Sequence, residues 1–176
     1  DRFAHRIEGA KATTLLYGIV DPAAGTLRYT SAGHPPALVI DVDGNARFLE
    51  DARGWPLAVT DPSRVRPEAV ATVAPGSTIV LYTDGLIERR TEHLEAGLAR
   101  LACAASARVH LPVERMADEL LDELVGGERR DDVALVVLRT AHAESVAFTC
   151  RVPAKPEELV NVRRELRRWL EGQDVP

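Results

Sequence analysis

The sequence contains few of the residues that stabilise small secreted proteins or anchor membrane proteins. Only 2 of its 176 residues are cysteines, and Cys103 and Cys150 are far apart and form no CxxC pair. A disulfide framework or a cysteine-ligated zinc site is therefore not expected, and the two thiols fit a reducing, cytoplasmic location. No apolar run approaches the roughly 18 residues of a membrane span, so no membrane contact is expected in this segment.

Basic residues are also fewer than acidic residues. The 22 Lys and Arg residues face 27 Asp and Glu residues, which gives a formal net charge of -5 and argues against non-specific nucleic-acid binding. The remaining composition, 45% hydrophobic and 28% charged, is ordinary for a folded globular chain of about one domain. The function must therefore depend on particular residues.

Two acidic motifs lie next to apolar segments that are predicted to be strands. Thr83-Asp84-Gly85 follows STIVLY, and Asp131-Asp132 precedes VALVVL. A carboxylate at the end of a buried strand is held rigidly at the sheet edge, where oxygen ligands can gather a hard divalent cation. A turn or a helix cap explains either motif taken alone. Together they predict half of a metal site.

Three segments carry a family resemblance. LLYGIVDPAAGTLRYTSAGHPPALVI, LYTDGLIERR and RDDVALVVL, in that order, resemble the later half of PPM-type (protein phosphatase 2C-like) serine/threonine phosphatases, in the SpoIIE-like and RsbU-like branch. The resemblance implies an α+β fold, a partial αββα sandwich of antiparallel sheets flanked by helices whose amino-terminal part is missing.

The resemblance also implies a cofactor and its ligands. The family uses a binuclear Mg²⁺ or Mn²⁺ centre to activate the water that attacks a phosphoserine or phosphothreonine, so no protein nucleophile is needed. By similarity, Asp84 would be a terminal ligand of one metal and Asp131 the ligand of the last motif. Asp132 is the alternative if the register shifts by one residue. Gly85, Gly33 and His34 belong to the supporting motifs.

The sequence departs from the family at two places. No Asp-Gly-His-Gly type motif, which would supply the bridging aspartate, occurs, and a hairpin turn explains Asp43-Gly44. Ala134 stands where the family usually has Thr or Ser, whose hydroxyl would steady the loop. We therefore expect a piece of a longer protein. Without the bridging aspartate, this piece by itself should be inactive and bind manganese weakly. It should also be marginally stable or prone to aggregate, because sheet faces and strand edges would lack cover.

The sequence does not favour a serine-hydrolase site at Ser31 and His34. The sequence contains no GxSxG motif, and Ser31 ends a predicted strand rather than opening a helix. The SAGHPP segment is instead expected to form a stiff corner in which the imidazole satisfies backbone groups.

Sequence patterns predict the elements that surround these motifs. One β-hairpin joins TTLLYGIV to TLRYTSAG, and a second turns at residues 43–45. In GWPLAV, we expect a loop that packs Trp55 and Leu57 on the core. Two helices should cover the sheet that carries the acidic motifs. Their predicted buried faces are Leu94, Leu98, Leu101 and Ala105 in the first, and Val113, Met116, Ala117, Leu120, Leu121 and Leu124 in the second.

The composition changes after Thr140. We predict a phosphatase part at 1–140, a linker at 141–145 and the truncated start of another domain at 146–176, with a strand in VAFTCRV and a helix over 156–170. FTCRVPAKPEELVNVRRELRRWL resembles the opening of an anti-sigma-factor (RsbW-like) histidine-kinase-type ATPase domain. The ATP-binding motifs are absent, so no ATP binding is expected. Glutamates lie among the arginines of this helix, so we expect an ordinary solvent-exposed face and not a nucleic-acid or membrane site.

Three functions remain open. The first is a metal-dependent phosphatase that acts on a phosphorylated regulator such as an anti-anti-sigma factor, with a sigma factor as a further partner of the carboxy-terminal domain. The alternatives are a non-catalytic interaction module and a part of an anti-sigma-factor kinase or ATPase regulator.

Overall fold

The computed structural model describes residues 4–7, 11–61, 63–89, 92–125, 132–141 and 158–171. The chain divides into two compact units, residues 1–140 and 141–176. Asp131 and the predicted strand at 146–152 lie outside the described residues.

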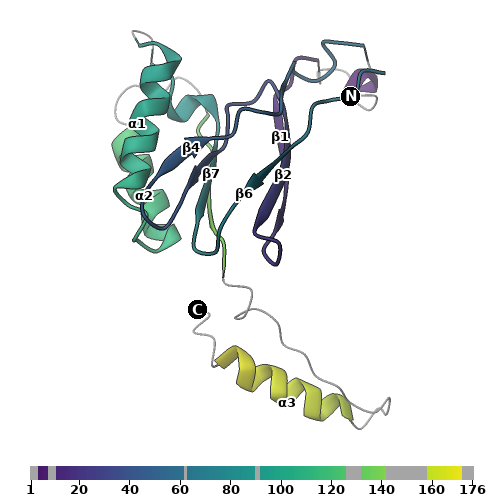
Figure 1. Cartoon of the computed structure of the whole chain (residues 1–176), viewed down its shortest axis with the longest axis vertical. Coiled ribbons are helices and arrows are strands. Elements are labelled where there is room, and N and C mark those ends of the chain that lie inside the picture. Colours follow the sequence, from purple (N-terminus) through teal and green to yellow (C-terminus); the bar gives the residue numbers. More distant parts are fainter. Residues whose placement is uncertain are drawn as a thin grey trace. The chain divides into compact units, whose positions relative to one another are not determined.

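The first unit is built from two sheets and a layer of helices. The first sheet contains β1 (Leu15–Asp21), β2 (Thr26–Ala32), β5 (Arg53–Gly54) and β6 (Ala69–Thr72). The second has the order β4 (Ala46–Phe48), β3 (Leu38–Ile40), β7 (Thr78–Tyr82) and β8 (Leu135–Arg139). Figure 1 shows the sheets facing each other, with α1 (Leu94–Ser106) and α2 (Val113–Leu124) against the outer side of the second sheet. The pairing is antiparallel except between β2 and β5, which confirms the predicted α+β class.

Both predicted hairpins are present. β1 and β2 pair antiparallel from Leu15 with Ala32 to Asp21 with Thr26, and the Asp21 carboxylate accepts hydrogen bonds from two turn amides. β3 and β4 form the second hairpin, where the Asp41 carboxylate accepts from the backbone of Asp43 and Asn45. Short Asp side chains favour such turns because they can replace backbone hydrogen bonds locally.

Alternation along the central strands creates two apolar cores. In β7, Val80 and Tyr82 pack toward the helices, whereas Ile79 packs toward the first sheet with Val39 of β3. Successive side chains of a strand point to opposite faces, so one strand contributes to both cores. The second sheet is thereby buried on both faces at its centre, which fixes the register of β7.

The helices cover the second sheet as predicted, with one correction. Met116, Leu120 and Leu124 of α2 are buried, as expected from their spacing. In α1, Leu101 and Ala105 are buried, but Leu94 is 47% exposed. The prediction for Leu94 is wrong because this residue is the first of the helix, and it is Gly97 that packs against Ile87 in the turn after β7.

Apolar side chains also remain exposed on both sheets. Leu15, Tyr17 and Ile19 of β1 are about half exposed, and Val136 and Leu138 of β8 are similarly open. Within the described residues, no layer covers these faces, as expected for a partial sandwich.

The GWPLAV segment differs from its prediction. Trp55 is 63% exposed and does not pack in the core, whereas Leu57 is half-buried. The backbone of Leu57 pairs with Thr13 and Ala12 ahead of β1, which holds the loop at the surface and directs Trp55 outward.

The second unit contains α3 (Glu158–Glu171), which confirms the helix predicted there. Arg163, Arg164, Arg167 and Arg168 are exposed on it. Among the described residues, no helix combines the length and apolar character needed to cross a membrane.

The first helix packs closely on the turn after β7. A Cβ atom added to Gly97 would lie 2.3 Å from the carbonyl oxygen of Ile87. Arg100, one turn later, donates a hydrogen bond to the same oxygen over 3.1 Å and forms an ion pair with Glu92. Gly97 is therefore the contact point between the helix layer and residues 84–88.

We expect Gly97→Ala to lower the free energy of unfolding by about 1–3 kcal/mol, because the added methyl group would force the helix away from Ile87. The better helix propensity of alanine would offset about 1 kcal/mol of the strain. Urea unfolding of the purified protein measures the difference. Ala96→Ser, at an exposed position of the same turn, is the control and should change stability little.

Candidate functional site

The candidate site lies where β7 ends and β8 begins. The two strands pair antiparallel from Thr78 with Arg139 to Tyr82 with Leu135. This register brings the segment after Tyr82 beside the segment before Leu135. Asp84 and Asp132, remote in sequence, therefore belong to one end of the sheet.

Thr83 joins the two segments by three hydrogen bonds. Its amide donates to the carbonyl oxygen of Ala134 over 3.0 Å, and its hydroxyl accepts from the Ala134 amide over 2.9 Å. The same hydroxyl donates to the carbonyl oxygen of Asp132 over 3.1 Å. Thr83 thus supplies the steadying hydroxyl that the sequence lacks at position 134. Sequence reasoning missed this role because it depends on a pairing between distant segments.

Asp84 opens a short 3-10 turn, η2 (Asp84–Leu86), and its side chain is exposed. Its carbonyl oxygen accepts from the amides of Ile87 and Glu88, and one carboxylate oxygen accepts from the amide of Gly85 over 2.9 Å. Leu86 and Ile87 are buried beneath the turn. The apolar residues anchor the turn, and among the described residues only one carboxylate oxygen of the exposed Asp84 side chain has a hydrogen-bond partner.

Gly85 permits the close approach of the two segments. A Cβ atom at this position would lie 2.8 Å from the carbonyl oxygen of Asp132. Any larger residue would push the Asp132 segment away from Asp84. The supporting role expected for Gly85 thus has a steric basis.

The residues present fit a divalent cation only in part. The Asp84 carboxylate offers the hard oxygen donor that magnesium or manganese prefers. However, the described residues contain no group of three or more His, Cys, Asp or Glu side chains that could hold a metal ion. Asp132 is exposed, and Asp131 is not among the described residues. A cation at this end of the sheet would require ligands beyond those described.

Gly33 and His34 form a corner at the end of β2. Gly33 has a positive φ of 68°, and a Cβ atom there would lie 2.5 Å from Cγ of Pro56, so only glycine fits. The Nδ1 atom of His34 lies 3.2 Å from the Thr14 hydroxyl. The expectation that the imidazole satisfies backbone groups is therefore wrong: its described partner is a side chain.

The Ser31 hydroxyl donates to the carbonyl oxygen of His34 over 3.1 Å. The serine is thus directed to the backbone of His34 and not to its imidazole. This geometry does not resemble a nucleophile activated by a histidine, which requires a hydrogen bond to the ring.

Replacing the Thr83 hydroxyl tests how the site is held together. We expect Thr83→Val to lower the free energy of unfolding by about 1–3 kcal/mol, because it removes two hydrogen bonds and leaves the Ala134 amide without this acceptor. Thr83→Ser keeps the hydroxyl and should remain close to the original stability. Chemical denaturation of both variants gives the comparison; if Thr83→Ser lost as much stability as Thr83→Val, the hydroxyl would not account for the effect.

Comparisons with known proteins agree with this architecture. The profile of the family described as Stage II sporulation protein E (SpoIIE) matches residues 1–141. Protein IcfG of Synechocystis is 26% identical over 133 residues, covering 73% of this chain and 21% of IcfG.

Solved structures are similar as well. The RsbU and RsbW domains of Rv1364c from Mycobacterium tuberculosis are 30% identical with a TM-score of 0.74, covering 98% of this chain and 48% of that one. The phosphatase domain of SpoIIE from Bacillus subtilis, presoaked with Mn, has a TM-score of 0.57 at 16% identity, covering 81% of this chain and 59% of that one, and shows a shared fold.

The chain spans about a fifth of IcfG and about half of the Mycobacterium structure. The family match nevertheless includes both strands that carry the acidic motifs, β7 and β8. On this basis, the chain belongs to the SpoIIE family of PP2C-like phosphatase domains.

Proposed function

We propose that this chain contributes the later metal ligands of a metal-dependent protein serine/threonine phosphatase that acts on a phosphorylated regulatory protein. The observation that carries the proposal is the β7–β8 register, which places Asp84 beside the Asp132 segment at one sheet end. Membership of a phosphatase family supports the reaction class. The bridging aspartate of the family does not occur in this sequence, so a complete centre needs a ligand from outside it.

The roles of the chain's own residues follow from their positions. Asp84 would direct its free carboxylate oxygen toward a metal, and Asp131 would do the same from the start of β8. Thr83 and Gly85 would keep the two segments at a fixed separation. The chemistry that a magnesium or manganese pair supplies when bound is activation of water and neutralisation of phosphoryl oxygens.

The substrate class is also part of the proposal. We propose a phosphoserine or phosphothreonine in a regulator of the anti-anti-sigma-factor type, because the similar Mycobacterium structure contains RsbU and RsbW domains. A cytoplasmic location for this dephosphorylation, suggested by the cysteine content, remains a prediction.

A second proposal concerns residues 146–176, which we propose to be the start of an RsbW-like domain after a linker at 141–145. The similarity to the RsbU and RsbW domains covers 98% of this chain and thus extends beyond Thr140. The compact unit at 141–176 and the helix α3 support the division. Within this proposal, a sigma factor would be a partner of that domain.

The metal role of Asp84 is tested by Asp84→Asn in the complete protein. We expect manganese-dependent hydrolysis of a phosphoserine peptide to fall by about a hundredfold or more, because the variant loses a charged ligand. Asp43→Asn makes the same change in an exposed hairpin turn and should leave the rate unaltered. Activity retained by Asp84→Asn would favour an interaction module over an enzyme.

The register of the last motif is tested by Asp131→Asn and Asp132→Asn. We expect the first variant to lose most of the phosphatase activity, because Asp131 matches the family ligand. The second should retain most of it, since Asp132 is the register alternative, and the substitution keeps the backbone carbonyl that accepts from Thr83. Rates measured at several manganese concentrations separate weak binding from lost catalysis. The opposite ranking would shift the ligand assignment to Asp132.

A further inference from the structure

A basic hollow lies outside the acidic motifs. It has a volume of about 960 Å³ and lies between the end of β2 and the loop around residues 54–67. Within the part of the chain that the structure describes, its lining includes Arg53, Arg64 and Arg66 and no acidic residue, although the chain as a whole is acidic. Trp55, 63% exposed, and Val65, 89% exposed, add apolar surface.

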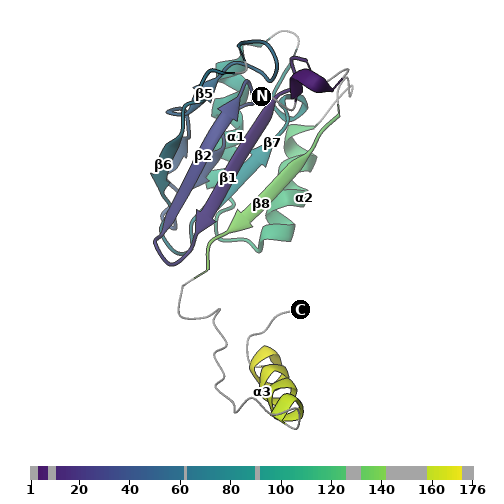
Figure 2. The same cartoon turned by 90° about the vertical axis from the view of Figure 1, so that its right-hand side faces the viewer.

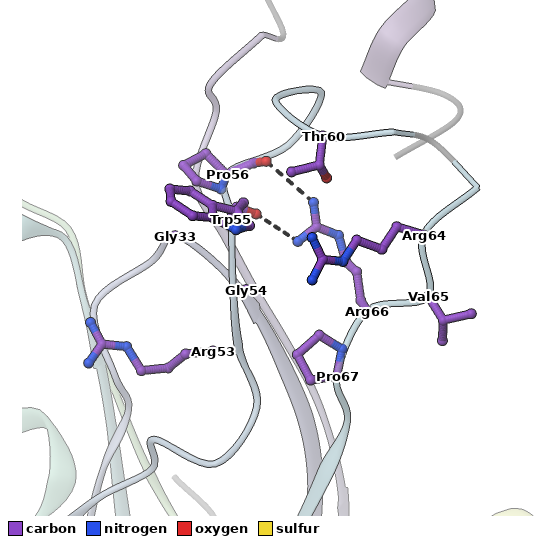
Figure 3. A pocket seen from close by; sticks show the side chains of 10 residues that line it. All are labelled: Gly33, Arg53, Gly54, Trp55, Pro56, Thr60, Arg64, Val65, Arg66 and Pro67. Atoms are coloured by element: carbon purple, nitrogen blue, oxygen red, sulfur yellow. Dashed lines mark hydrogen bonds between the residues drawn. The ribbon is translucent and has the colours of Figure 1, made fainter.

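Arg66 builds the wall of this hollow. Its guanidinium donates to the carbonyl oxygens of Trp55, over 2.7 Å, and Pro56, over 3.4 Å (Figure 3). On the other side, Gly33 packs against Pro56, and its amide donates to the carbonyl oxygen of Gly54 over 2.7 Å. Residues 54–56 and Arg66 are thus held in place before any ligand arrives, which lowers the ordering cost of binding.

The other two arginines differ in what holds them. Arg53 pairs with Glu50 over 3.2 Å and points away from Arg64 and Arg66 in Figure 3. Among the described residues, the Arg64 guanidinium has no hydrogen-bond or ion-pair partner, and its side chain is exposed. Arg64 is therefore the cation of the hollow that is available to an anionic ligand.

Residues that line the hollow lie at the same end of the sandwich as Asp84. In Figure 2, β8 runs to the lower end, so its antiparallel partner β7 finishes at the upper end, where Asp84 follows. β2 also finishes at the upper end, and Gly33 of the hollow follows it. A polypeptide presenting a phosphorylated residue at the Asp84 end would therefore have the hollow at that same end of the sandwich.

We propose that this hollow binds an acidic segment of the phosphoprotein substrate, flanking the phosphorylated residue. The inference rests on the proposed phosphatase function and names the chemistry of its substrate. Arg64 pairs with a carboxylate of that segment, and Trp55 and Val65 contact an adjacent apolar side chain. Charge complementarity supports this occupant, because Arg64 is available to an anionic group and the described lining contains no acidic residue.

Binding can be followed through Trp55 itself. The chain contains two tryptophans, so Trp169→Phe in the complete protein removes the other tryptophan of this sequence. The probe is a phosphoserine peptide flanked by glutamates and one leucine, titrated without metal while indole emission is recorded. A peptide with lysines in place of the glutamates is the comparison. We expect the glutamate peptide to bind more tightly and to weaken as salt is added.

Arg64→Ala should weaken binding of the glutamate peptide about fivefold, because one charge-assisted contact is lost. Arg64→Lys should recover part of the affinity. Arg115→Ala is the matched control: Arg115 is also exposed, but lies on α2, in the helix layer, and its loss should leave affinity unchanged. Equal affinity of the original protein and Arg64→Ala for the glutamate peptide would overturn the proposal.

Hydrolysis of p-nitrophenyl phosphate with manganese separates this inference from the proposed function, because that compound has no flanking residues. We expect Arg64→Ala to keep the original rate on it while its KM for the glutamate peptide rises about fivefold. If the original protein hydrolysed neither p-nitrophenyl phosphate nor the glutamate peptide, the phosphatase proposal would be overturned, even if Arg64-dependent peptide binding remained. If both proteins hydrolysed the two substrates and Arg64→Ala had the same KM for the glutamate peptide as the original protein, only the role of the hollow would be overturned.

Discussion

The antiparallel pairing of β7 with β8 is the constraint on which the candidate site depends. Asp132 follows Thr83 by 49 residues, and the helix layer lies between them in sequence. Only the ladder from Thr78 to Tyr82 brings their backbones into contact. Since β7 is buried on both faces, its register cannot slip without moving apolar side chains out of both cores. The stability of the core therefore also fixes the position of Asp84.

The helix layer extends this control to the turn itself. Arg100 and Gly97 both meet the carbonyl oxygen of Ile87, three residues after Asp84. At the opposite end of β8, Arg139 donates to the carbonyl oxygens of Leu111 and Val109, which joins the strand to the connection between α1 and α2. Both ends of the strand pair are thus tied to the helices.

The basic hollow shows how a structural and a binding role can divide between neighbouring residues of one type. Arg66 is committed to carbonyl oxygens of the loop, whereas Arg64, two residues earlier, is exposed to solvent. The sequence suggested neither role, and it placed Trp55 in the core. A tryptophan beside a proline has no periodicity that distinguishes packing from exposure; the outcome depended on backbone pairing between Leu57 and Thr13.

Local patterns in the sequence determined the hairpins, the buried face of α2, the helix α3 and the family resemblance. Turn chemistry and periodic apolar spacing act between residues that are close in the chain, so they can be read directly. Tertiary structure decided the exposure of Leu94 and Trp55, the side-chain partner of His34, and the use of Thr83 in place of a hydroxyl at Ala134. Each of these depends on which distant backbone segments meet, and that is set by strand register and layer packing rather than by neighbouring residues.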